Sequence, residues 1–175
     1  MCNLKVLYFM GIIVLINGIS LDNLKSALTT HRQKFWTRFR SFNVATKGHK
    51  HECIYAEVRP MSAHEYIYLQ HYEVASKWHS NLFYATVLPP RKGGNGPIMR
   101  VSSKRGAQGV DYMLLFWDAT EHCALFTRIY KGQRHCEMHV WQDHVAGHVP
   151  RCQLAYKAFC SGLQEFPIYT RQCRP

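Results

Sequence analysis

The chain is poor in charge, and in acidic residues above all. Only 19% of its 175 residues are charged, and 11 Asp and Glu stand against 22 Lys and Arg, for a formal net charge of +11. Few charges together with 47% hydrophobic content exclude an intrinsically disordered chain. The length suits one domain with a hydrophobic core and is too short for two ordinary domains. The excess positive charge favours acidic partners without choosing among nucleic acid, glycosaminoglycan and anionic membrane.

Signatures of catalysis are missing as well. The chain has no Gly-x-Ser-x-Gly nucleophile motif, no phosphate-binding loop and no Asn-x-Ser/Thr acceptor for N-glycosylation. It also has no internal repeat and no linker composition. We therefore expect a single domain that is not an enzyme and uses no cofactor.

Hydrophobic runs long enough to span a membrane are lacking too. The apolar run near the N-terminus, Val6 to Ile16, has 11 residues, whereas a membrane span needs about 20. Lys5 precedes this run, and small residues follow it as a cut after Ser20 requires. The pattern predicts a secretory signal peptide over residues 1–20 and a mature domain over residues 21–175, with a membrane anchor as the disfavoured alternative.

Six of the 7 cysteines lie in the predicted mature chain. An even number in an extracellular chain favours disulfides over metal ligands and nucleophiles, although the count alone leaves fifteen pairings open. A zinc site can be drawn from His122-Cys123, His135-Cys136 and His139, since Cys and His are the usual zinc ligands. Because disulfides account for the thiols, we expect no bound metal.

From Phe35 to Trp141 the sequence has the rhythm of strands. Short aromatic and β-branched segments alternate with turn signals such as Lys92-Gly93-Gly94. The expected strands are Phe35 to Val44, Cys53 to Val58, Tyr66 to Val74, Asn81 to Leu88, Ile98 to Ser103, Val110 to Trp117, Cys123 to Tyr130 and Cys136 to Trp141. Eight strands in succession predict a β-sandwich or a closed barrel.

One helix is expected on each side of the strands. Ser20 or Asp22 suits the cap of a short helix before them. Pro150 opens a helical pattern after them, and Gly162 stands where a helix commonly ends.

The strand that ends at Trp141 has two different faces. Alternation places Cys136 with apolar neighbours on one face and Glu137, His139 and Trp141 on the other. If the C-terminal helix covers the Cys136 face, the acid and the imidazole point into the lumen of a barrel.

Alternation on the preceding strand places Phe126 and Arg128 inward. A few polar groups among aromatic rings are the usual composition of a ligand pocket. A bulge can invert the faces of a strand, however, so a cross-strand pair of Arg128 and Glu137 on the solvent side is the alternative.

The stretch from Asp111 to Cys173 resembles the tick salivary lipocalins, which include histamine-binding proteins. The matching pieces, in order, are Asp111-Tyr112, Asp118 with Cys123, Cys136-Glu137-Met138, Pro150 with Cys152, Tyr156 with Cys160, and Tyr169 with Cys173. The resemblance implies an all-β fold: an eight-stranded antiparallel lipocalin barrel with a C-terminal helix packed outside. It also implies the disulfides Cys53–Cys173, Cys123–Cys152 and Cys136–Cys160.

The chain departs from the amine-binding members of that family. They carry Cys-Asp and Glu-Leu-Trp, whereas residue 124 here is Ala and residue 139 is His, so only Glu137 remains. Arg128 would oppose a cationic amine and would suit the carboxylate of a fatty acid such as a leukotriene. We therefore favour a lipid over a biogenic amine such as histamine or serotonin. The candidate ligand-binding residues are Tyr112, Phe116, Phe126, Arg128, Glu137, His139 and Trp141.

We predict a secreted, monomeric lipocalin that sequesters a small amphipathic host mediator to suppress inflammation or haemostasis. We expect neither nucleic acid nor membrane as a partner. The alternative is a scaffold that binds a host protein or glycosaminoglycan through its loops and basic side chains. The basic candidates are Arg38, Arg40, Arg91, Lys92, Arg100, Lys104 and Arg105.

Overall fold

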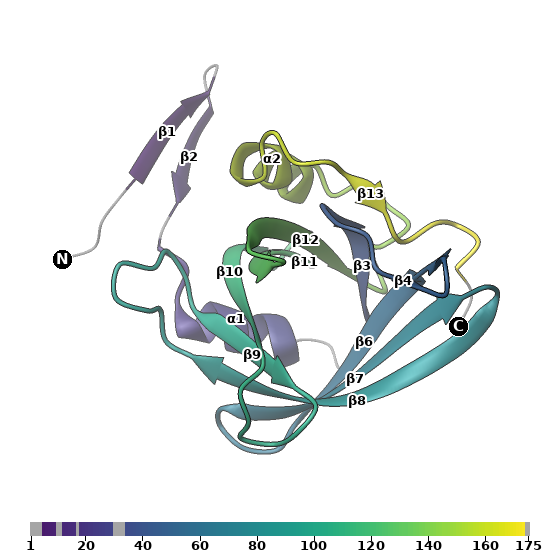
Figure 1. Cartoon of the computed structure of the whole chain (residues 1–175). Coiled ribbons are helices and arrows are strands. Elements are labelled where there is room, and N and C mark those ends of the chain that lie inside the picture. Colours follow the sequence, from purple (N-terminus) through teal and green to yellow (C-terminus); the bar gives the residue numbers. More distant parts are fainter. Residues whose placement is uncertain (1–4, 10–11, 17, 30–33, 174–175) are drawn as a thin grey trace.

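A computed structural model of the chain describes residues 5–9, 12–16, 18–29 and 34–173. Eight antiparallel strands follow one another around a barrel, which closes because β12 pairs with β3 as well as with β11 (Figure 1). The barrel strands are β3 (Phe35–Arg40), β6 (Glu52–Pro60), β7 (Glu65–Val74), β8 (Lys77–Leu88), β9 (Ile98–Ser102), β10 (Val110–Asp118), β11 (Cys123–Tyr130) and β12 (Gln133–Trp141). The predicted eight-stranded barrel is confirmed, with strand ends that differ from the expected ones by a few residues.

Short strands add to this frame. β4 (Ala45–Thr46) and β5 (His49–Lys50) form a hairpin, and β13 (Phe166–Pro167) pairs with the end of β3. β1 (Lys5–Phe9) and β2 (Ile12–Ile16) form a separate two-stranded sheet. The predicted signal peptide contains this sheet and also residues outside the described ranges, so its removal stays a prediction.

Helix α1 (Leu21–Thr29) covers one end of the barrel. Its buried Leu24 and Leu28 share a hydrophobic cluster with the lumen residues Phe126 and Trp141. Ser20 begins the helix: its Oγ accepts a hydrogen bond from the Asn23 backbone N–H at 3.2 Å, and the Asn23 Oδ1 accepts one from the Ser20 N–H at 2.8 Å. This reciprocal cap satisfies backbone donors that the first turn leaves unpaired.

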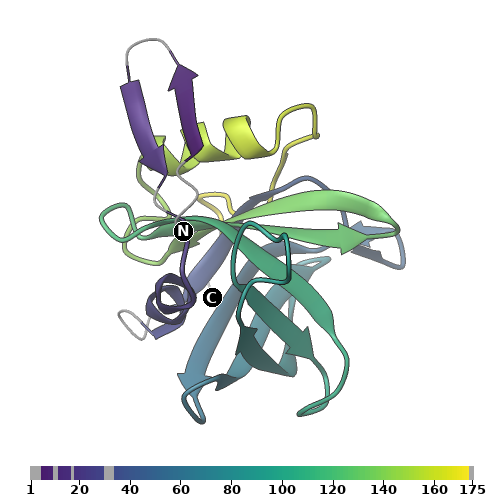
Figure 2. The same ribbon diagram turned by 90° about the vertical axis from the view of Figure 1, so that its left-hand side faces the viewer.

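Helix α2 (Pro150–Phe159) lies outside the barrel, over β10, β11 and β12 (Figure 2). Disulfides fasten both of its ends, Cys123–Cys152 to β11 and Cys136–Cys160 to β12, and Cys53–Cys173 fastens the C-terminal segment to β6. All three pairings implied by the family resemblance are confirmed. Among the described residues, neither helix has the length and apolar character needed to cross a membrane.

The disulfides close loops of very different length, which predicts different contributions to stability. Cys53–Cys173 spans 120 residues and Cys136–Cys160 spans 24. In the chain-entropy model these loops contribute about 5 and about 3.5 kcal/mol. Urea unfolding of the Cys53→Ser/Cys173→Ser protein should show the larger loss, and a larger loss from Cys136→Ser/Cys160→Ser would contradict loop entropy as the main cause.

The cap on α1 bears on where the mature chain begins, because a cut after Ser20 would remove it. A recombinant chain of residues 19–175 should have a free energy of unfolding about 1 kcal/mol higher than one of residues 21–175. Urea titration of the two refolded proteins measures the difference. Equal stabilities would show that the cap contributes nothing.

Candidate functional site

Strand β12 places a carboxylate and an imidazole inside the barrel. Cys136 and Met138 pack beneath α2, whereas Glu137 and His139 point into the lumen, where they are 7% and 3% exposed. Their side chains lie 3.2 Å apart, between Glu137 Oε2 and His139 Nε2. The alternation of β12 predicted from the sequence is therefore present in the structure.

Arg128 reaches the same group from β11. Its Nη1 donates a hydrogen bond to the Tyr112 hydroxyl at 2.7 Å and lies 3.8 Å from Glu137 Oε1. Its guanidinium carbon lies 5.1 to 5.2 Å from the ring centroids of Phe42, Tyr112 and Tyr130. These rings stabilise a cation that is largely out of water.

A second arginine, Arg40, completes the group, although the sequence analysis placed it among surface residues. It is 4% exposed, lies opposite Glu137 on β3, and donates from Nη2 to the His51 carbonyl at 3.3 Å. β3 carries an extra residue opposite β12 between Thr37 and Phe39. This bulge resets the alternation of β3 and turns Arg40 inward, so strict alternation from Phe35 would not have found it.

A bulge in β10 corrects another expectation. The register with β11 shifts between Leu114 and Phe116. As a result, Phe116 packs into the cluster beneath α2, and its prediction as a lumen residue is wrong. Trp117 takes a place in the lumen instead, with its ring centroid 5.0 Å from that of Trp141.

The remaining predicted residues lie together in the lumen. The His139 ring makes T-shaped contacts with the Phe126 and Phe35 rings, with ring centroids 5.4 Å apart in each pair. Phe35 in turn stacks on Trp141, also with centroids 5.4 Å apart. The structure thus brings together six of the seven candidates: Tyr112, Phe126, Arg128, Glu137, His139 and Trp141.

Positive charge exceeds negative charge in this group. Burial tends to raise the pKa of Glu137, but the hydrogen bond to His139 and the charges of His139, Arg128 and Arg40 lower it below its ordinary value of 4.5. Burial lowers the pKa of Arg40 despite Glu137, and it raises that of Tyr112. The Nε atoms of both arginines and Nδ1 of His139 are buried without a hydrogen-bond partner, so the site can accept a further hydrogen-bonding group that carries negative charge.

Exposure falls with depth in the lumen. The side chains of Arg128, Glu137 and His139 are 14%, 9% and 4% exposed, and Phe126 next to the α1 cluster is 1% exposed. The side chains of the polar group are therefore more exposed than those packed against α1.

Several of the basic side chains considered for a surface site have carboxylate partners. Arg91 and Arg100 both pair with Asp111, and Arg105 pairs with Glu65. These pairs reduce the positive potential that a protein or glycosaminoglycan partner would recognise.

Removal of the Glu137 charge should destabilise the fold, because Arg40 and Arg128 would lose their shared counter-charge. Glu137→Gln should lower the free energy of unfolding by about 3 kcal/mol. The control Glu57→Gln removes a partly exposed carboxylate near His71 and should cost less than about 1 kcal/mol. Urea unfolding at pH 7 measures both, and equal effects would contradict a special role for Glu137.

The same carboxylate predicts a response to acid. Because folding lowers the pKa of Glu137 below 4.5, its contribution to stability is present above that pH and is lost as the pH falls through the lowered value. Glu137→Gln should lack this component of the pH dependence. Urea midpoints of the two proteins, measured from pH 6 downward, test this. If the wild-type and Glu137→Gln midpoints ran parallel with pH, the prediction would be wrong.

Comparisons with known proteins agree with this architecture. A family model described as tick histamine binding protein matches residues 19–175. No curated protein matches the chain in sequence. Among solved structures, AM182 in a serotonin complex has a TM-score of 0.65 at 13% identity, covering 90% of this chain and 94% of that one. Japanin from Rhipicephalus appendiculatus, bound to cholesterol, has a TM-score of 0.55 at 13% identity, covering 82% and 97%.

At these identities the solved structures show a shared lipocalin fold and nothing finer. The family model is the stronger finding, since it spans the barrel, both helices and all six disulfide-bonded cysteines. This chain belongs to the tick histamine-binding protein family.

Proposed function

We propose that this protein is a secreted lipocalin that takes a small amphipathic ligand with a carboxylate head group into its barrel. By doing so it removes a host lipid mediator, such as a leukotriene, and suppresses inflammation or haemostasis. One observation carries the proposal: Arg40 and Arg128 share the lumen with a single carboxylate, Glu137, and each keeps a buried Nε–H without a partner.

A carboxylate head group meets both needs of this arrangement. It supplies the missing negative charge, and its oxygens accept charge-assisted hydrogen bonds from guanidinium N–H groups. A head group beside Arg128 also lies near the Tyr112 hydroxyl, which Arg128 already contacts at 2.7 Å.

Aromatic rings near Arg40 provide surroundings for the apolar tail. Phe42 lies 5.1 Å from the Arg40 guanidinium, and His51, whose carbonyl binds Arg40, stacks on Tyr72 at 4.5 Å. The deep end is occupied by Leu24 and Leu28 of α1. We infer that the tail runs from the arginines away from α1.

A biogenic amine is the second candidate, favoured by Glu137 and by the serotonin complex of the structural neighbour AM182. An ammonium ion in the lumen needs a carboxylate to offset its desolvation. Here Glu137 already contacts His139 and Arg128. An amine therefore has to displace existing partners of Glu137, which a fatty acid does not.

Native mass spectrometry against leukotriene, arachidonate, cholesterol, histamine and serotonin tests the choice of ligand. Arg128→Met should weaken binding of the two fatty acids at least about tenfold, the effect of losing one charged hydrogen bond, and leave uncharged cholesterol unchanged. Glu137→Gln should abolish an amine adduct and leave a fatty acid unchanged or tighter. The matched control is Arg105→Met, which removes an exposed arginine paired with Glu65 and should change nothing.

Two results would overturn the proposal. Fatty-acid binding that survives Arg128→Met and Arg40→Met together would show that the arginines do not hold the head group. Absence of every adduct in a protein whose intact mass shows three disulfides would favour the scaffold function and a host protein as the partner.

A further inference from the structure

Three side chains that commonly bind metals converge outside the lumen, where β11 begins and β12 ends. His122 immediately precedes β11, and Asp143 and His144 follow β12. The Trp141 N–H donates to the His122 carbonyl at 2.9 Å, and the His144 N–H donates to the Trp141 carbonyl at 2.9 Å. The first bond joins the two strand ends, and the second forms a turn that brings His144 back toward them.

The Asp143 carboxylate lies between the two imidazoles. Its Oδ2 is 2.6 Å from His122 Nδ1, and its Oδ1 is 3.1 Å from His144 Nδ1. One ligand atom from each residue lies within 4.8 Å of the other two. The three side chains are 15%, 32% and 38% exposed, so an ion can reach them from solvent.

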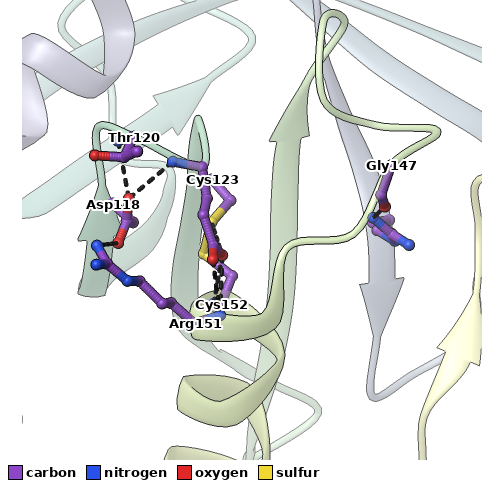
Figure 3. The surroundings of a disulfide bond; sticks show 8 residues. Asp118, Thr120, Cys123, Gly147, Arg151 and Cys152 are labelled. Atoms are coloured by element: carbon purple, nitrogen blue, oxygen red, sulfur yellow. Dashed lines mark hydrogen bonds and ion pairs between the residues drawn. A yellow bond between two sulfur atoms is a disulfide. The ribbon is translucent and has the colours of Figure 1, made fainter.

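Contacts of neighbouring residues restrain the two segments that carry these side chains. Cys123, which follows His122 in the sequence, forms a disulfide with Cys152. At the start of α2, Arg151 Nη1 pairs with Asp118 Oδ2 at 3.0 Å (Figure 3). On the other side, Arg38 Nη1 donates to the Gly147 carbonyl at 2.7 Å. His122 itself has a φ of 46°, in the left-handed region that non-glycine residues rarely adopt. The backbone on both sides of the three side chains is therefore restrained by neighbouring contacts.

We propose that His122, Asp143 and His144 form a binding site for a transition-metal dication, with Zn²⁺ as the best fit. Two imidazoles and a carboxylate, with water as the fourth ligand, form a recurrent tetrahedral zinc set. Zinc–ligand bonds of about 2.0–2.2 Å place such ligands about 3.3 Å apart. The His122 and Asp143 atoms, now 2.6 Å apart, therefore have to separate, and the three ligand atoms, which lie within 4.8 Å of one another, have to adopt that spacing. Ca²⁺ and Mg²⁺ prefer oxygen ligands and do not suit the site.

This site differs from the zinc set considered from the sequence. The two share His122, but the thiols of Cys123 and Cys136 are in disulfides and cannot bind a metal. The proposal is also independent of the ligand in the lumen, because the site lies outside the barrel. A bound ion would tie the loop after β12 to the start of β11, beside the disulfide that fastens α2.

Isothermal titration of metal-free protein with Zn²⁺ tests the site. We expect one Zn²⁺ per chain, at least about tenfold weaker binding for His144→Gln and for His122→Asn, and none for the double variant, since even indirect partners of a metal ligand matter by that factor. Asn is chosen at residue 122 because it tolerates the left-handed backbone. His49→Gln, which removes an exposed histidine on β5, is the matched control and should leave binding unchanged.

Further measurements separate loss of the site from loss of the fold. The intact mass of each variant should show three disulfides and its circular dichroism should match that of the wild type. Co²⁺ should give the visible absorption of tetrahedral coordination in the wild type and not in the double variant. Added Zn²⁺ should raise the melting temperature of the wild type and leave that of the double variant unchanged. No heat on titration of the wild type, or equal affinity in the wild type and the double variant, would overturn the proposal.

Discussion

The pairing of β3 with β12 is the interaction on which the rest of the structure depends. It closes the barrel, so that neither strand is left with a free edge there. Within the closed barrel one face of β12 is buried in the lumen, and α2 covers the other face. Because Arg40 lies opposite Glu137 in this register, the step that closes the barrel also assembles the charged group.

That group is costly in a way that points to binding. Two guanidinium groups share one carboxylate, and the rings around Arg128 and the Tyr112 hydroxyl compensate only part of the lost hydration. In a group that served folding alone, matched charges or apolar residues would be more stable. A surplus cation with a buried, unpaired N–H is a stability cost that a ligand of opposite charge can relieve.

Alternation predicted the faces of β11 and β12 because their pairing is regular from end to end. Every residue from Cys123 to Tyr130 has a partner on β12 without a shift, so Phe126, Arg128, Glu137 and His139 were placed correctly. The two errors, Phe116 and Arg40, both lie beyond a bulge. A bulge depends on how two strands fit around a closed barrel, and local composition does not determine that fit. The disulfide pairings came from the family resemblance, because six cysteines alone leave fifteen pairings open.

The cluster of His122, Asp143 and His144 was missed for a different reason: these residues are far apart in the sequence. They can be related from the sequence once the hairpin register is known. Lys131 and Gly132 both have positive φ, at 50° and 76°, as the tightest hairpin turn requires. This turn pairs Tyr130 with Gln133 and, eight positions further out along a regular ladder, brings His122 beside Trp141. Asp143 and His144 belong to the turn that begins at Trp141 and therefore lie close to His122. Counting outward from a two-residue turn therefore locates ligand sets at strand ends that a search for sequence-adjacent ligands overlooks.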